Sequence, residues 1–135
     1  MRIPVQAATR PEQSPDGIDR TVLDDLLGLG DAFTHVVRSY LDTAPGRLDD
    51  LEAAVTAGDG PSVGRIAHLM AGSSGCVGAT VLAASCSALE QAVRVGEAPQ
   101  PAALVRLRLQ HARAAEALGA LLVEGDGELG ARAGR

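Results

Sequence analysis

The sequence predicts an all-α fold: an antiparallel up-down four-helix bundle with a short additional helix on its N-terminal side. Hydrophobic residues make up 46% of the 135 residues, which is enough for one core. Phe33 and Tyr40 are the only aromatic residues, so the core consists of Leu, Val, Ile and Ala, which suit packed helices better than a sheet. Apolar residues recur at three- and four-residue spacing, and the breaks between these periodic segments are short.

Five helical segments follow from this periodicity. The first is short, covers about 19–27 and ends before the turn residues Gly28 and Gly30. The second covers 31–57 and has the clearest apolar stripe. Pro45 lies inside it and removes one backbone hydrogen bond, so that one kinked helix and two abutting helices both fit the pattern.

The remaining three helices are separated by glycine and proline. Pro61 suits the first turn of a third helix that runs to about Gly75. A fourth helix covers about 79–95. After the break at 98–101, a fifth helix runs to about Glu124. The short connections imply that consecutive helices are antiparallel neighbours.

The ends of the chain lack this pattern. Residues 1–16 hold three prolines and no periodicity, and residues 125–135 are rich in Gly and Arg, so both are expected to be flexible. The expected domain therefore covers 17–124. The initial Met suggests a stand-alone protein.

Composition excludes several classes of function. The net charge is −5, which argues against sequence-independent nucleic-acid binding. All 12 basic residues are Arg, so the chain has no lysine for a nucleotide-binding loop or a kinase strand. Neither a signal peptide nor a membrane span is evident, and Cys76 and Cys86 are interpreted as small buried hydrophobes. We expect a soluble cytoplasmic protein, with no metal or cofactor of its own.

The third helix carries the most informative side chain, His68. At about 100° per residue, Ile66, Met70 and Val77 fall on the side opposite His68, so the histidine is predicted to face solvent. By contrast, His35 and His111 are interpreted as boundary or core-edge residues.

The face around His68 is unusually bare. The residues that project within about 60° of it are small, namely Gly64, Ala71, Gly72 and Gly75, apart from Arg65. Three glycines cost a helix about 1 kcal/mol each relative to Ala, although Gly75 alone also fits a helix end. One gain from this cost is clearance, because another protein's active site can approach the ring. A neutral imidazole keeps a lone pair for nucleophilic attack, which suits phosphoryl transfer.

The segment 66–79, IAHLMAGSSGCVGA, resembles the signature of histidine phosphotransfer (HPt) domains, roughly A-H-x-L-K-G-S-S-x-x-x-G-A. Further positions that match the family are Leu82, Leu89-Glu90, Phe33, Tyr40-Leu41, Pro45, Arg47-Leu48 and Leu51. The resemblance covers about residues 18–122.

The resemblance implies roles for individual residues. His68 corresponds to the phospho-accepting histidine, and Gly72 to the glycine that leaves room for the phosphoryl group. Ser73 and Ser74 match small residues that help to pack the following turn.

Two positions depart from the family's pattern. Met70 replaces the usual Leu, a volume-conserving change. Ala71 stands where the family has Lys, and we hypothesise that Arg65 supplies the missing positive charge.

The function implied is that of a phosphorelay intermediate without autonomous kinase activity. Its partners would be receiver domains of response regulators or a hybrid sensor histidine kinase, and the receiver would bring Mg²⁺ and the acidic residue. We expect a monomer. Because Ala71 replaces the usual lysine, one alternative is a degenerate adaptor that docks receivers or kinases without being phosphorylated. A second alternative is a purely structural helical domain, which the bare face around His68 disfavours.

Overall fold

The computed structural model describes residues 16–133, with their side chains up to residue 123, and the regular secondary structure of this part of the chain is all α-helix. The helices are α2 (Arg20–Leu27), α3 (Asp31–Ala57), α4 (Gly60–Cys76), α5 (Thr80–Arg94) and α6 (Pro101–Ala133). The prediction of an all-α fold is confirmed.

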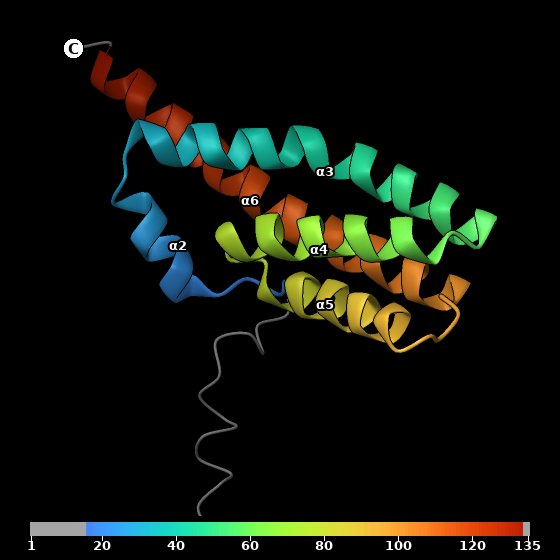
Figure 1. Cartoon of the computed structure of the whole chain (residues 1–135). Coiled ribbons are helices and arrows are strands. Elements are labelled where there is room, and N and C mark those ends of the chain that lie inside the picture. The colour runs from blue at the N-terminus through green and yellow to red at the C-terminus, as the bar shows by residue number, and fades with distance from the viewer. Residues whose placement is uncertain (1–15, 134–135) are drawn as a thin grey trace, which may run out of the picture.

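Helices α3 to α6 form the bundle, and consecutive helices run in opposite directions (Figure 1). Going round the bundle, α3 packs against α4, α4 against α5, α5 against α6, and α6 back against α3. The short helix α2 contacts α3 and covers one end (Figure 1). This is the predicted up-down arrangement with one additional N-terminal helix.

Local chemistry explains where the helices begin and end. The Asp19 side chain accepts a hydrogen bond from the Thr21 amide and caps α2, and Asp59 caps α4 in the same way through Ser62. Helix α3 ends at Ala57 and is capped by Gly58, whose left-handed backbone (φ 67°) suits glycine. Pro45 lies within α3, which continues through it as one helix, and this decides between the two arrangements that the sequence left open.

The predicted end of the last helix was wrong. Helix α6 continues past Glu124 to Ala133, because the glycines there lower helix propensity without blocking a helix, and no proline follows. The division into a domain and two flexible ends stays a prediction, since residues 1–15 and 134–135 lie outside the described part.

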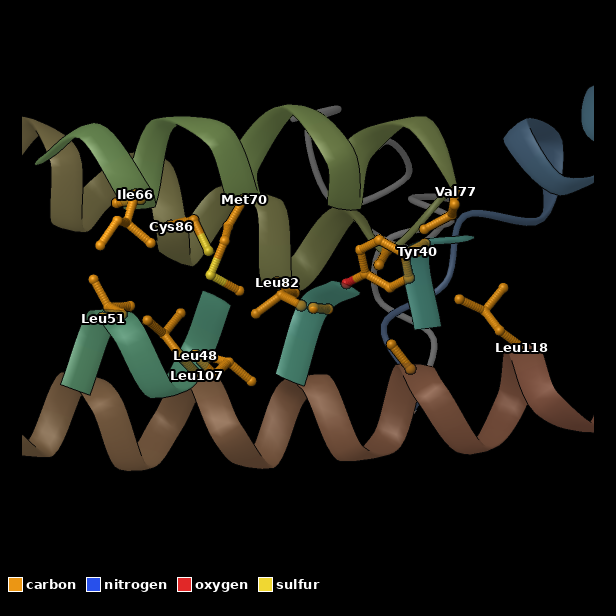
Figure 2. Packing of buried hydrophobic residues seen from close by; sticks show 14 of the residues in the cluster. Tyr40, Leu48, Leu51, Ile66, Met70, Val77, Leu82, Cys86, Leu107 and Leu118 are labelled. Atoms are coloured by element: carbon orange, nitrogen blue, oxygen red, sulfur yellow. The ribbon is translucent and has the colours of Figure 1, made fainter. Parts of the chain in front are cut away.

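The core lies between α4 and α5 on one side and α3 and α6 on the other. Figure 2 shows Ile66 and Met70 of α4 directed toward Leu48 and Leu51 of α3, and all four are buried. At one end of this core the Tyr40 hydroxyl lies 3.0 Å from the Ser74 hydroxyl in a buried hydrogen bond. The aliphatic core that composition predicted is therefore present, and it fixes which face of α4 is left for solvent.

Candidate functional site

His68 lies on the outer face of α4. Its side chain is 72% exposed, whereas Ile66 and Met70 on the opposite face of the same helix are buried. The expectation that the imidazole points away from the core is confirmed. Since the apolar stripe anchors α4 on its inner side, the ring is held at the surface by the packing of the whole helix.

Glu90 of α5 is the hydrogen-bonding partner of His68. The imidazole Nδ1 lies 3.2 Å from Oε1 and 3.1 Å from Oε2 of this carboxylate. A carboxylate only accepts hydrogen bonds, so a neutral His68 makes this contact with its proton on Nδ1. The lone pair is then on Nε2, the nitrogen on the far side of the ring from Glu90.

Glu90 is itself held by a cation. Arg94, one turn later on α5, donates a hydrogen bond from Nη2 to Oε2 of Glu90 at 2.7 Å. The Glu90 side chain is only 18% exposed, while those of His68 and Arg94 are 72% and 64% exposed. The carboxylate is thus the shielded centre of a three-residue chain, with the imidazole on one side and the guanidinium on the other.

These side chains line an open groove of about 570 Å³ between α4 and α5. Arg65, His68 and Leu69 contribute from α4, and Val93 joins Glu90 and Arg94 from α5. Leu69 is 47% exposed and adds apolar surface to the groove. The groove therefore offers an imidazole, two cations and apolar surface to an approaching molecule.

The glycines predicted around His68 divide into two kinds. A Cβ at Gly72 would meet nothing within 4 Å, so this position leaves open space one turn after His68. A Cβ at Gly64 would lie 3.9 Å from Val93, and one at Gly75 would lie 4.0 Å from Ala83, so these two face α5. Of the three, Gly72 is the glycine that provides clearance toward solvent.

Ala71, where the family has lysine, and Arg65, which could supply the same charge, lie in different surroundings. Ala71 is partly buried and packs against the core, so its methyl group does not line the groove. Arg65 is exposed and lines the groove together with His68. A positive charge is therefore present beside the imidazole, but it comes from one turn before His68 rather than from position 71.

The two serines after Gly72 support the end of α4. Ser74 is fully buried and bonded to Tyr40, and Ser73 accepts a hydrogen bond from Arg47 of α3 at 3.3 Å. These contacts agree with a packing role for both serines, since each joins α4 to α3.

Sequence reasoning did not assign Glu90 or Arg94 to the site. Their spacing of four residues on one helix was readable as an ion pair, but nothing in the sequence places them across from His68. The interpretation of Cys76 as buried was also wrong: this last residue of α4 is exposed, whereas Cys86 is buried in the core. Burial raises the pKa of the Cys86 thiol to about 12, which keeps it protonated.

The described residues also bear on metal binding and on membrane association. Their side chains include no group of three or more His, Cys, Asp or Glu residues arranged to hold a metal ion. Of the helices that the structure describes, none combines the length and the hydropathy that a membrane crossing needs.

Comparisons with known proteins agree with this architecture. Residues 35–122 match the sequence profile of the Hpt domain. The fold is similar to the crystal structure of histidine-containing phosphotransfer protein B (HptB) from Pseudomonas aeruginosa PAO1, with a TM-score of 0.78 and 27% sequence identity over 82% of this chain and 98% of that chain. None of the curated proteins that were compared matches this sequence.

Proposed function

The chain belongs to the Hpt domain family and is a histidine phosphotransfer protein, and from this premise we propose that His68 is the residue that carries the phosphoryl group. The observation that carries the proposal is the environment of the ring. Its side chain is 72% exposed on a helix face that is open at Gly72, and its Nδ1 faces Glu90.

The proposed reaction uses Nε2 of His68 as the nucleophile. Nε2 attacks the phosphorus of an aspartyl phosphate on a receiver domain, so a P–N bond forms while the P–O bond to the aspartate breaks. The aspartate leaves as a carboxylate. The ring becomes positively charged, and Glu90 stabilises this charge through the hydrogen bond from Nδ1. Transfer to the next receiver reverses these steps, and the imidazole leaves as a neutral group.

Access and charge support the same site. An incoming receiver has to bring its aspartate close to Nε2, and a side chain at Gly72 would stand in the open space one turn away. We propose that Arg65 offsets part of the phosphoryl group's negative charge, since it lines the groove beside His68 and position 71 is alanine.

Hpt domains act in two-component phosphorelays with receiver domains. For this chain, we propose receivers of response regulators or a hybrid sensor histidine kinase as the partners. The receiver is proposed to supply Mg²⁺ and the acidic residue, because Glu90 is already engaged by His68 and Arg94. We also propose that the protein is a monomer and acts in the cytoplasm.

Phosphorylation of the purified chain tests the proposal. The protein is incubated with a phosphorylated receiver, or with a hybrid kinase plus ATP and Mg²⁺, and is then analysed for phosphate that is labile in acid and stable in base. We expect His68→Gln to lose the label while His35→Gln and His111→Gln keep it.

Two results would contradict the proposal. Label that persists in the His68→Gln variant would place the phosphoryl group elsewhere. If no donor labels the folded wild-type chain, and the chain nevertheless binds receivers or kinases, the protein is the adaptor that the absence of a lysine at position 71 first suggested.

A further inference from the structure

The Glu90 carboxylate is shared between two helices and two functional groups. Its Oε2 lies 3.1 Å from Nδ1 of His68 on α4 and accepts a 2.7 Å hydrogen bond from Arg94 on α5. The imidazole is therefore hydrogen-bonded to the carboxylate, and the carboxylate in turn accepts a hydrogen bond from the guanidinium. Arg94 can thus act on the position of the imidazole proton through Glu90.

We propose that Arg94 is a positioning residue for phosphotransfer. By binding Oε2, it holds Glu90 against Nδ1 of His68, so that the proton of the neutral ring stays on Nδ1 and the lone pair stays on Nε2. This inference rests on the proposed role of His68, and it adds a residue that positions another side chain.

The geometry of α5 suits this role. Glu90 and Arg94 are four residues apart with the glutamate first, which is the favoured order for an ion pair on a helix. Arg94 is the last residue of α5, where a cation also interacts favourably with the helix dipole. A second hydrogen bond, from Nη1 to the Gln91 side chain at 3.2 Å, further limits the guanidinium. The Arg94 guanidinium is therefore held by hydrogen bonds to both Glu90 and Gln91 before a partner binds.

A free glutamate would not hold this position as well. Glu side chains have several rotatable bonds, and ordering them costs conformational entropy. Among the described residues, the hydrogen bonds to the carboxylate come from Arg94 and from the highly exposed imidazole of His68, so loss of Arg94 leaves the imidazole as the hydrogen-bonding partner. Exposed ion pairs contribute little to folding, so the expected consequence of losing Arg94 lies in the proton of the ring rather than in the stability of the bundle.

Arg94 also reduces an electrostatic conflict. After transfer, the negative phosphoryl group on Nε2 and the Glu90 carboxylate belong to the same small site. The Arg94 cation, bonded to that carboxylate, offsets part of their repulsion. The same contact thus supports the ring before transfer and the phosphorylated ring after it.

The tautomer of His68 can be measured directly, without any phosphotransfer. Long-range ¹⁵N–¹H NMR spectra of the full chain distinguish a protonated from an unprotonated ring nitrogen, at a pH where the imidazole is neutral. We expect the wild-type protein to show His68 mainly in the Nδ1–H form. Arg94→Ala and Glu90→Ala should both lose this preference, and Arg94→Lys should recover part of it.

The matched control is Arg106→Ala, which removes an exposed arginine from α6. It should leave the His68 spectrum unchanged. Phosphoryl transfer from a phosphorylated receiver should slow several-fold in Arg94→Ala and remain unchanged in Arg106→Ala, while both variants keep the wild-type melting temperature.

The possible failures are distinguishable. If Glu90→Ala shifts the tautomer and Arg94→Ala does not, Glu90 is positioned without Arg94 and the inference is wrong. If neither variant shifts it, the role given to Glu90 is wrong as well. If the tautomer responds as expected but His68 is never phosphorylated, the inference about the ring stands and the proposed function fails.

Discussion

The described part of the chain contains two histidines whose surroundings differ sharply, His68 on α4 and His111 on α6. The His68 ring is exposed and its Nδ1 faces the Glu90 carboxylate. His111 is half-buried, its ring centroid lies 6.2 Å from that of Tyr40, and its buried Nε2 has no hydrogen-bond partner among the described residues. Burial lowers the pKa of His111, and the Arg108 cation lowers it further.

This difference separates the proposed phosphoacceptor from the other histidine. Both histidines lie on helices of the same bundle, so neither residue type nor secondary structure separates them. A reactive ring needs one nitrogen held by an acceptor and the other open to a partner, and only the surroundings of His68 provide both among the three described histidines. Because the inner face of α4 carries the core and the outer face carries the site, the two should respond independently to mutation.

Gly72→Leu tests this independence most strongly. A Cβ at position 72 meets nothing within 4 Å, so the substitution does not crowd the bundle at that atom, and it removes a helix glycine that costs about 1 kcal/mol. The side chain would, however, fill the clearance beside His68. We expect phosphotransfer to fall by about 100-fold, which corresponds to about 2.7 kcal/mol, while the melting temperature stays equal or rises.

Gly119→Leu on α6 is the matched control, since a Cβ there also meets nothing within 4 Å. It should keep the stability gain and the wild-type transfer rate. A wild-type rate in Gly72→Leu would show that the open space after His68 has no part in docking.

Tyr40→Phe tests the opposite region. The substitution removes the hydrogen bond to Ser74 and leaves a buried serine hydroxyl without its partner. Unsatisfied buried groups of this kind cost about 1–3 kcal/mol, measurable by urea denaturation monitored by circular dichroism. The phosphotransfer rate of the folded protein should not change, and a large loss of rate would mean that the core and the site are coupled.

Much of this architecture could be predicted from the sequence, because helical periodicity reports which face of each helix is buried. The opposition of His68 to Ile66 and Met70 is local to one helix, so spacing along the chain was sufficient to predict it. The starts of α2 near residue 19 and of α4 near Pro61 were also predicted from neighbouring residues, and the structure adds that Asp19 and Asp59 are the capping side chains.

Features that depend on the packing of two helices could not be predicted in this way. Glu90 is 22 positions from His68 and meets it only because α4 and α5 lie side by side. The direction of Gly64 and Gly75 toward α5 has the same origin. Periodicity gives the angle of a residue around its own helix, but not the neighbour that occupies that angle, which is why the two kinds of glycine looked alike in the sequence.

Arg65→Ala tests the charge of the site at a position that the sequence did suggest. Arg65 is exposed and lines the groove with His68. Because water screens exposed charges, we expect phosphotransfer to slow by less than about tenfold, with a larger effect at low salt than at high salt. Arg113→Ala, on α6, serves as the control for the loss of an exposed arginine. Equal transfer rates for the wild type and Arg65→Ala would show that Arg65 does not replace the positive charge of the lysine that the family has at position 71.

The smallest expected effect concerns the pH dependence of stability, and it belongs to His111. Its pKa in the folded protein is lowered from the ordinary value of 6.5, so as the pH falls through that value the unfolded chain binds the proton before the folded chain does. Stability should therefore decrease on acidification, and the decrease should end once the pH is below the folded-state pKa. His111→Gln cannot bind this proton, and its melting temperature between pH 8 and pH 5 should fall less than that of the wild type.

His35→Gln is the control for this pH series, because His35 is exposed on α3. If His111→Gln and the wild type lose stability equally on acidification, the half-buried ring accepts its proton without cost. In that case the contrast between the two histidines would rest on access to a partner alone. If the melting temperature of the wild type falls more steeply with pH than that of His111→Gln, the surroundings of His111 disfavour a positively charged ring. The same charge would arise if the ring accepted a phosphoryl group, and burial beside Tyr40 also hides the ring from a receiver.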